Sequence, residues 1–279
     1  MSLQRLLAYQ RPYTALFRIR LHEGLQYRVA AWAGASTSIF WALIEITMFT
    51  VFYTYAENRE AGFMAGLSLR QVVSYVWIGQ TLFMMQLSLD PDLLAKIEDG
   101  DVAVEMCRPL DLYNHWLART VANRLTPLVW RGSFVLLAGM LIPGSYGLGA
   151  PASWLGLILA CISAFSALCL SSAYCMVVYA VRMRVDWGNG PMHLLLLVSS
   201  VLSGSYLPLQ LWPESLQTFL LLQPFAGYLD IPARLFVGSL PPEHAYGPML
   251  LQWIWVIIFA IAGRWLLHRR LQSMIVQGG

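Results

Sequence analysis

The sequence is poor in charge, since only 12% of its 279 residues are Asp, Glu, Lys or Arg, against about 25% in an average soluble domain. Lysine is almost absent, and Lys96 is the only one in the chain. Lys96 lies between Ala95 and Ile97, so it cannot belong to a G-x-x-x-x-G-K-[ST] loop, whose lysine contacts the phosphates of a nucleotide. The sequence therefore excludes ATP hydrolysis through a P-loop of this chain's own.

Cysteine is also scarce, and its spacing matches no metal site or disulfide framework. The four cysteines are Cys107, Cys161, Cys169 and Cys175. The last three lie within one apolar run, where cysteine acts as a small hydrophobic residue. The five histidines are scattered, and the basic residues are spread along the chain instead of forming a patch. We therefore expect no metal site, no bound cofactor, no catalytic residues and no nucleic-acid partner.

Apolar residues are abundant and make up 58% of the chain. A membrane-spanning helix needs about 20 apolar residues. We expect an all-α integral membrane protein, with one transmembrane domain over residues 1–279 and six spanning helices, of which the fifth is marginal in length. The six expected spans are residues 29–55, 72–89, 117–142, 154–181, 192–207 and 249–267.

Residues 1–28 combine leucines at helical spacing with five arginines. The arginines interrupt any apolar core of a signal peptide, so we do not expect one here. The pattern predicts an amphipathic helix that lies in a membrane surface, bent at Pro12.

The basic residues predict the orientation of the chain, because cytoplasmic segments of membrane proteins are rich in Lys and Arg. With the N-terminus inside, fifteen of the eighteen basic residues fall on the inner side. We therefore expect a multi-pass protein of a bacterial cytoplasmic (inner) membrane, with both termini in the cytoplasm. Residues 208–248 then lie outside. Their apolar patches, 216–222 and 231–237, are too short to span and predict short re-entrant helices.

Residues 90–111, which we call the charged segment, lie between the second and third expected spans. They hold Lys96 and seven of the fifteen acidic residues, namely Asp90, Asp92, Glu98, Asp99, Asp101, Glu105 and Asp111. Such a polar segment cannot lie in lipid, so it must face water. The spacing of its carboxylates does not fit the twelve-residue calcium loop of an EF-hand.

The first half of the charged segment predicts a short helix. Asp90 or Asp92 can cap its start, and Gly100 can end it. Leu93, Leu94 and Ile97 would form one apolar face of this helix. In the second half, residues 100–110, the alternation of Val102, Val104 and Met106 predicts a packed, strand-like return segment.

Ionisable residues inside the expected spans are costly and often functional, and three of them carry a hypothesis here. Glu45 lies near the middle of the first span, and Arg131 lies at a depth where it could pair with Glu45. Glu45 could equally bond a neighbouring helix and take part in no chemistry. Arg124 and Arg131 are seven residues apart, so they share a helix face. They either attract an anionic substrate or lipid headgroup, or extend toward the cytoplasmic interface.

Two stretches carry a resemblance to a known family. The first is Ile-Glu-Asp-Gly-Asp-Val-Ala-Val-Glu-Met-Cys-Arg-Pro-Leu, residues 97–110. The second is Leu-Ser-Gly-Ser-Tyr-Leu-Pro-Leu-Gln-Leu-Trp-Pro, residues 202–213, followed by Gln-Pro-Phe at 223–225. With its interfacial helix, six spans and charged segment, the chain resembles a small bacterial permease subunit of an ABC transporter of the type-2 exporter class, which works with a separate ATPase.

The resemblance implies that two permease subunits, identical or homologous sister chains, pair in the membrane among its lipids. Two ABC ATP-binding subunits would dock beneath them, with ATP and magnesium bound in those partners. The coupling helix that enters a groove of the ATPase would lie between residues 92 and 99. Its docking residues would be Asp92, Leu93, Leu94, Lys96, Ile97, Glu98 and Asp99.

The function expected from this resemblance is export of an amphipathic or hydrophobic molecule, which could be a peptide, drug, lipid or glycan. Two alternatives remain open at this point. One is an intramembrane lipid-modifying enzyme with Glu45 and Arg131 in its site, and the other is a carrier that uses Glu45 as a proton relay. Neither alternative gives the charged segment a role.

Overall fold

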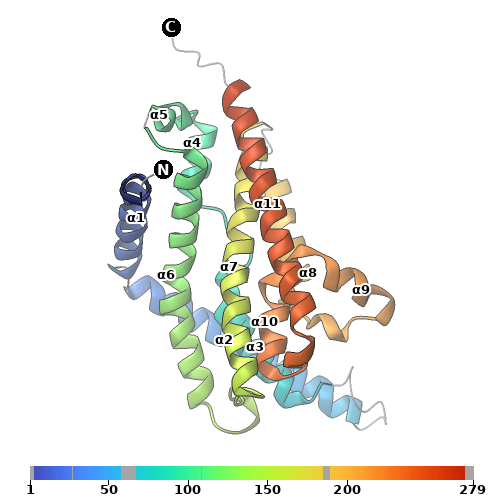
Figure 1. The fold of residues 1–279 in the computed structure, drawn as a ribbon. Coiled ribbons are helices and arrows are strands. Elements are labelled where there is room, and N and C mark those ends of the chain that lie inside the picture. The colour runs from blue at the N-terminus through green and yellow to red at the C-terminus, as the bar shows by residue number, and fades with distance from the viewer. Residues whose placement is uncertain (1–2, 27, 58–66, 108, 185–188, 274–279) are drawn as a thin grey trace.

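Figure 1 shows the computed structural model, which describes residues 3–26, 28–57, 67–107, 109–184 and 189–273. Every regular element in these ranges is helical, which confirms the predicted all-α fold. The α-helices are α1 (Leu3–Gln26), α2 (Arg28–Glu57), α3 (Leu69–Thr81), α4 (Pro91–Glu98), α5 (Val102–Met106), α6 (Leu112–Leu141), α7 (Trp154–Arg182), α8 (Asn189–Leu202), α9 (Glu214–Leu222), α10 (Asp230–Val237) and α11 (Tyr246–Ser273).

The long helices α6, α7 and α11 run along one another through the molecule, with α7 in contact with both of the others (Figure 1). Small residues allow α7 and α11 to approach closely: a Cβ atom added at Gly263 of α11 would lie 3.2 Å from Met176 Cβ of α7. The hydroxyl of Ser163 also donates to Gln252 Oε1 across this contact, at 3.0 Å. Helix α1 lies beside α6, and it continues through Pro12 without interruption.

Among the described residues, three helices are long and apolar enough to cross a membrane, and they include residues 32–55, 154–182 and 246–272. They correspond to the first, fourth and sixth expected spans. The third expected span lies in α6, which has 30 residues but carries three arginines. The fifth lies in α8, which has only 14 residues.

The second expected span, residues 72–89, is not one continuous helix. Helix α3 ends at Thr81, a 3₁₀ turn covers Leu82–Met85, and the chain is extended at Gln86. Arg124 of α6 donates to the carbonyl oxygens of Gln86 and Ser88, each at 2.8 Å. These carbonyls lack helical partners, so the buried guanidinium satisfies backbone groups that would otherwise be costly to bury.

The expected apolar patches at 216–222 and 231–237 lie in the short helices α9 and α10. Helix α10 is held by Asp230, whose side chain is 0% exposed. Asp230 Oδ1 accepts hydrogen bonds from Tyr75 Oη of α3 at 3.0 Å and from the Leu209 backbone N–H at 3.3 Å. One buried carboxylate therefore joins α10, α3 and the loop that follows α8.

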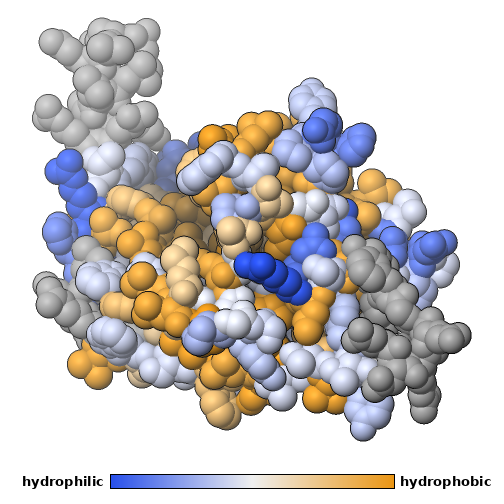
Figure 2. Space-filling model, turned by 90° about the horizontal axis from the view of Figure 1, so that it is seen from below, coloured by the Kyte–Doolittle hydropathy of each residue, from blue (hydrophilic) through white to orange (hydrophobic). Residues whose placement is uncertain are grey.

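The two ends of the molecule differ. Helices α4 and α5 lie at the same end as the last turns of α7 and α11 (Figure 1). Figure 2 views the opposite end, where hydrophobic side chains cover much of the surface and hydrophilic ones lie among them. Trp154 and Tyr246, which begin α7 and α11, are strongly exposed there. Exposed aromatic residues at helix ends are typical of a membrane–water boundary.

Candidate functional site

The charged segment folds as two short helices. Asp90, one of the two caps that the sequence allowed, is the N-cap of α4 and accepts a hydrogen bond from the Asp92 backbone N–H at 3.0 Å. The chain leaves α4 through Gly100, whose φ of +79° favours glycine. The strand-like prediction for residues 100–110 was wrong, because residues 102–106 form α5.

Helix α5 explains the alternation that suggested a strand. Val102 is 1% exposed and packs inward, whereas Val104 is 64% exposed and Met106 also faces solvent. Glu105 lies three residues after Val102, so both share the inner face of the helical turn. A strand would instead have placed residues 102, 104 and 106 on one face.

The start of α4 is fixed to α6 by charge. Arg119 of α6 donates to Asp90 through Nε at 2.6 Å and Nη2 at 3.0 Å, and its Nη2 also reaches Asp92 at 2.9 Å. Asn123, one turn along α6, donates to Asp90 Oδ2 at 2.7 Å. The Asp90 backbone N–H donates to Tyr179 Oη of α7 at 2.8 Å. A bidentate guanidinium–carboxylate pair stabilises the contact between α4 and α6 and fixes the orientation of the two side chains.

The inner face of α4 packs into an apolar cluster. Leu93 is 0% exposed and belongs to the same buried cluster as Val102, Trp116 and Tyr179. The rings of Trp116 and Tyr179 meet edge to face with their centroids 6.0 Å apart. Leu93 therefore anchors α4 to α6 and α7. Its side chain does not reach the surface of the chain, and its role in docking a partner stays a prediction.

Glu105 joins α5 to both α4 and α6. Its Oε1 accepts from Lys96 Nζ at 2.5 Å, and its Oε2 accepts from Trp116 Nε1 at 2.6 Å. Burial of Glu105 tends to raise its pKa, but the hydrogen bonds from Lys96 and Trp116 outweigh that effect and lower the pKa below its ordinary value. The only lysine of the chain thus neutralises a buried carboxylate.

The end of α4 is tied to α7. Arg182, in the last turn of α7, donates from Nη2 to Glu98 Oε1 at 2.5 Å. The Glu98 side chain is about half exposed, whereas that of Arg182 is nearly buried. Because Asp90 joins α6 and Glu98 joins α7, both ends of α4 are held by the bundle.

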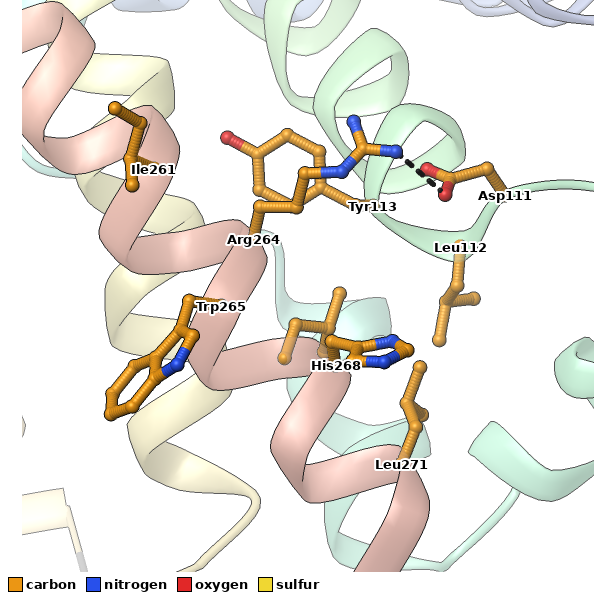
Figure 3. Close-up of a pocket in the computed structure, with 9 residues that line it drawn as sticks. Asp111, Leu112, Tyr113, Ile261, Arg264, Trp265, His268 and Leu271 are labelled. Atoms are coloured by element: carbon orange, nitrogen blue, oxygen red, sulfur yellow. Dashed lines mark hydrogen bonds and ion pairs between the residues drawn. The ribbon is translucent and has the colours of Figure 1, made fainter.

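The charged segment ends at Asp111, the N-cap of α6, which reaches α11 (Figure 3). Arg264 of α11 pairs with Asp111 Oδ2 at 3.1 Å, and its Cζ lies 5.6 Å from the centroid of the Tyr113 ring. These residues line a cleft of about 600 Å³ between α6 and α11. The Asp111 backbone N–H also donates to Tyr13 Oη of α1 at 3.0 Å.

The outward face of α4 and the adjoining turn is acidic. Asp92, Glu98, Asp99 and Asp101 are all exposed. Of the other predicted docking residues, Leu94, Lys96 and Ile97 are partly buried. A partner would therefore meet carboxylates on this face, beside the exposed Val104.

The comparison with known families matches residues 39–278 to the family described as ABC-2 family transporter protein. The chain belongs to the ABC-2 transporter family. This ABC-2 permease is thus the membrane component of an ABC transporter, which implies an ATP-binding partner. Neither the curated proteins nor the solved structures that were compared match the chain.

Glu45 and Arg131 of the permease bind different side chains. Glu45 Oε1 accepts from Gln80 Nε2 of α3 at 3.3 Å. Arg131 Nε donates to Ser38 Oγ of α2 at 2.9 Å, and its guanidinium lies 4.8 Å from the centroid of the Phe83 ring. Both residues therefore connect helices, and the hypothesis that they pair finds no support in these contacts.

Arg124 of the permease is 4% exposed, and its guanidinium binds groups of the chain itself. Besides the carbonyls of Gln86 and Ser88, it donates to Cys175 Sγ of α7 at 2.9 Å. Arg124 thus secures the extended chain that leads into α4. In the part of the permease that the structure describes, no group of three or more His, Cys, Asp or Glu residues could hold a metal ion.

Sequence analysis missed the partners that fix the charged segment, which are Trp116, Arg119, Asn123, Tyr179, Arg182 and Arg264. One signal was available. Arg119 and Asn123 are four residues apart, so they share a face of α6 directly after an acidic segment. The contacts to α7 and α11 bridge at least 84 residues of chain, and no local pattern encodes them.

Proposed function

We propose that this ABC-2 permease is the membrane-spanning subunit of an ATP-driven exporter, which moves an amphipathic or hydrophobic substrate out of the cytoplasm of a bacterium. Two ABC ATP-binding subunits would dock on the outward face of α4, and ATP and magnesium would be bound by them. A second permease, identical or homologous, would complete the pathway. This proposal places both termini and the charged segment in the cytoplasm.

The observation that carries the proposal is the way α4 is attached. A helix that transmits force must be joined rigidly to the elements that it moves, and a loop without packing would deform instead. Helix α4 meets this requirement through Asp90 at its start, Leu93 at its centre and Glu98 at its end. The exposed carboxylates of Asp99 and Asp101, which follow α4 and lie outside its ion pairs, remain available to a partner with a basic groove.

The contacts also favour an order in which the helices would respond to motion of α4. Helix α4 is bonded to α6 and α7, and Asp111 continues the connection to α11. Motion of α4 would therefore reach α6 and α7 directly. It would reach α3 only through the extended chain at Gln86, which Arg124 holds against α6.

Charge reversal on the outward face tests the docking assignment. Asp99 and Asp101 are exposed, and they lie outside the ion pairs that attach α4 to the bundle. We expect Asp99→Lys combined with Asp101→Lys to reduce co-purification of a co-expressed ABC ATP-binding subunit by at least about tenfold, because repulsion would replace attraction at the contact. Thermal unfolding of the isolated permease should change little.

The matched control reverses two exposed carboxylates outside the charged segment, Glu214→Lys with Glu243→Lys. This variant should retain the partner. Loss of the partner in the control alone, or full retention of it by the Asp99 and Asp101 variant, would refute docking at α4.

A further inference from the structure

Helix α11 carries an exposed stripe that runs toward the end where α4 lies. Its members are Ile254, Ile258, Ile261, Trp265 and Arg269, spaced by three or four residues so that they follow one face of the helix. The four apolar members are each at least 43% exposed. Helix α11 lies along α7 through its opposite face, which leaves the stripe largely exposed. At its two ends the stripe borders other clefts, since Ile254 lines one with Leu221 and Leu222 of α9, and Ile261 and Trp265 also line the cleft of Figure 3.

The stripe ends at a cationic cleft of about 690 Å³. Arg184, which follows α7, lines it together with Trp265, Arg269 and Arg270 of α11. The guanidinium carbon of Arg269 lies 4.3 Å from the centroid of the Trp265 ring. Among the described residues, no carboxylate lines the cleft. It differs in this from the cleft in Figure 3, where Asp111 neutralises Arg264.

The length of the stripe matches one leaflet of a bilayer. Eleven residues separate Ile254 from Trp265, which corresponds to about 16 Å along an α-helix. Half of the roughly 30 Å hydrocarbon core is about 15 Å. Trp265 would then lie at the boundary that tryptophan favours, with the arginines at the depth of the headgroups.

We propose that this surface of α11 binds one anionic phospholipid of the leaflet on the α4 side. The phosphate is held by Arg184 and Arg269, with Trp265 stacked beside the bound headgroup. An acyl chain lies along Ile261, Ile258 and Ile254. The combination favours a lipid over a soluble anion, because a soluble anion would use the arginines and leave the apolar stripe uncovered. The proposal rests on membrane embedding alone and is independent of ATPase docking.

Native mass spectrometry of the full-length permease in neutral detergent tests the site. The probes are phosphatidylglycerol and phosphatidylcholine with identical acyl chains. We expect the permease to prefer phosphatidylglycerol, and Arg184→Gln combined with Arg269→Gln to weaken its binding by about tenfold or more, since two charge-assisted hydrogen bonds are lost. Phosphatidylcholine binding should weaken less, because the choline cation offsets the charge of its phosphate.

A matched control removes two arginines from α1, with Arg18→Gln and Arg20→Gln, and should alter phosphatidylglycerol binding less than about twofold. Arg184→Lys with Arg269→Lys keeps the charge and should keep the preference, which separates a binding effect from misfolding. An equal loss in the α1 variant would overturn the proposal in favour of diffuse attraction. Complete displacement by millimolar inorganic phosphate would overturn it in favour of a soluble anion. Binding of a second permease copy to the stripe, in place of lipid, would also overturn it.

Discussion

Arg119 and Asp90 form an ion pair that is closed to solvent, with side chains 4% and 7% exposed. Removing one member leaves the other charged, buried and uncompensated, which costs roughly 3–5 kcal/mol. We expect Arg119→Gln to lower the free energy of unfolding by about this amount in a denaturant titration of the detergent-solubilised protein. The combined Arg119→Gln and Asp90→Asn variant should be less destabilised than the sum of the single variants.

The exposed pair of Arg20 and Glu23 provides the comparison, because its side chains are 27% and 52% exposed. Arg20→Gln should change the free energy of unfolding by less than about 0.5 kcal/mol. Equal effects of Arg20→Gln and Arg119→Gln would contradict the role assigned to the buried pair.

Glu105 makes a pH-dependent contribution to stability. Its folded-state pKa is lowered by its bonds to Lys96 and Trp116, against the opposing effect of burial. The ionised form is therefore favoured in the folded state, and the stabilisation is complete above the ordinary carboxylate pKa of about 4.3. It is lost as the pH falls through that value and then through the lowered folded pKa. We expect a shift from pH 7 to pH 3 to lower the melting temperature of the native protein more than it lowers that of the Glu105→Gln variant. Parallel profiles would refute this.

The individual residues of the charged segment were only partly predictable. Capping by Asp90 follows from local sequence, because an aspartate before Pro-Asp can accept from the next turn. The burial of Leu93 and the pairing of Lys96 with Glu105 do not, because both depend on Trp116 of α6. An exposed apolar face and a buried one have the same helical periodicity, so the sequence could not say which way α4 faces.

Helices α4 and α10 are both followed by a glycine in the same backbone conformation. Gly100 and Gly238 both have φ of +79°. A Cβ at Gly100 would meet no atom within 4 Å, whereas a Cβ at Gly238 would lie 2.4 Å from Ala152 Cβ. Gly100→Ala should therefore cost only the conformational penalty, about 1 kcal/mol. Gly238→Ala should cost about 1–3 kcal/mol more, because α10 must move away from the start of α7.

Denaturant unfolding of the two glycine variants measures this difference directly. Equal destabilisation would indicate that α10 does not pack against residue 152 as described. A larger effect at Gly100 would indicate that the turn between α4 and α5 is more constrained than its open surroundings suggest.

At the level of elements, the sequence predicted long apolar helices best. Helices α2 and α7 begin and end within two residues of the expected limits, because length and apolar composition suffice to define them. Helix α11 contains the expected residues 249–267 but continues to Ser273, since its last turns are polar. The interruption after Thr81 was missed, because the residues that follow remain apolar and Arg124, which satisfies their backbone, lies 38 positions away from Gln86. Helix α5 was missed because five residues can fit a strand pattern and a helical turn equally well.

At the scale of the whole molecule, the two ends are held together by different kinds of contact. At one end, ion pairs join α4 to α6 and α7, and a further ion pair joins Asp111, at the start of α6, to α11. Toward the other end, buried Asp230 joins α10 to Tyr75 of α3 and to the loop after α8. The long helices α6, α7 and α11 run between these regions (Figure 1). A displacement applied at α4 therefore has a continuous packed route to α10, since α7 contacts both.

The central claim is that an ATP-binding subunit docks on the outward face of α4, and site-specific cross-linking tests it most directly. The exposed Cys107 and Cys161, together with Cys169, are first replaced by serine, and the buried Cys175 is kept because it contacts Arg124. A single cysteine is then introduced as Asp99→Cys or, at the other end, as Glu243→Cys. A short thiol-to-amine cross-linker should join the ATP-binding subunit to the first variant and not to the second. A cross-link at position 243 with none at position 99 would contradict the account.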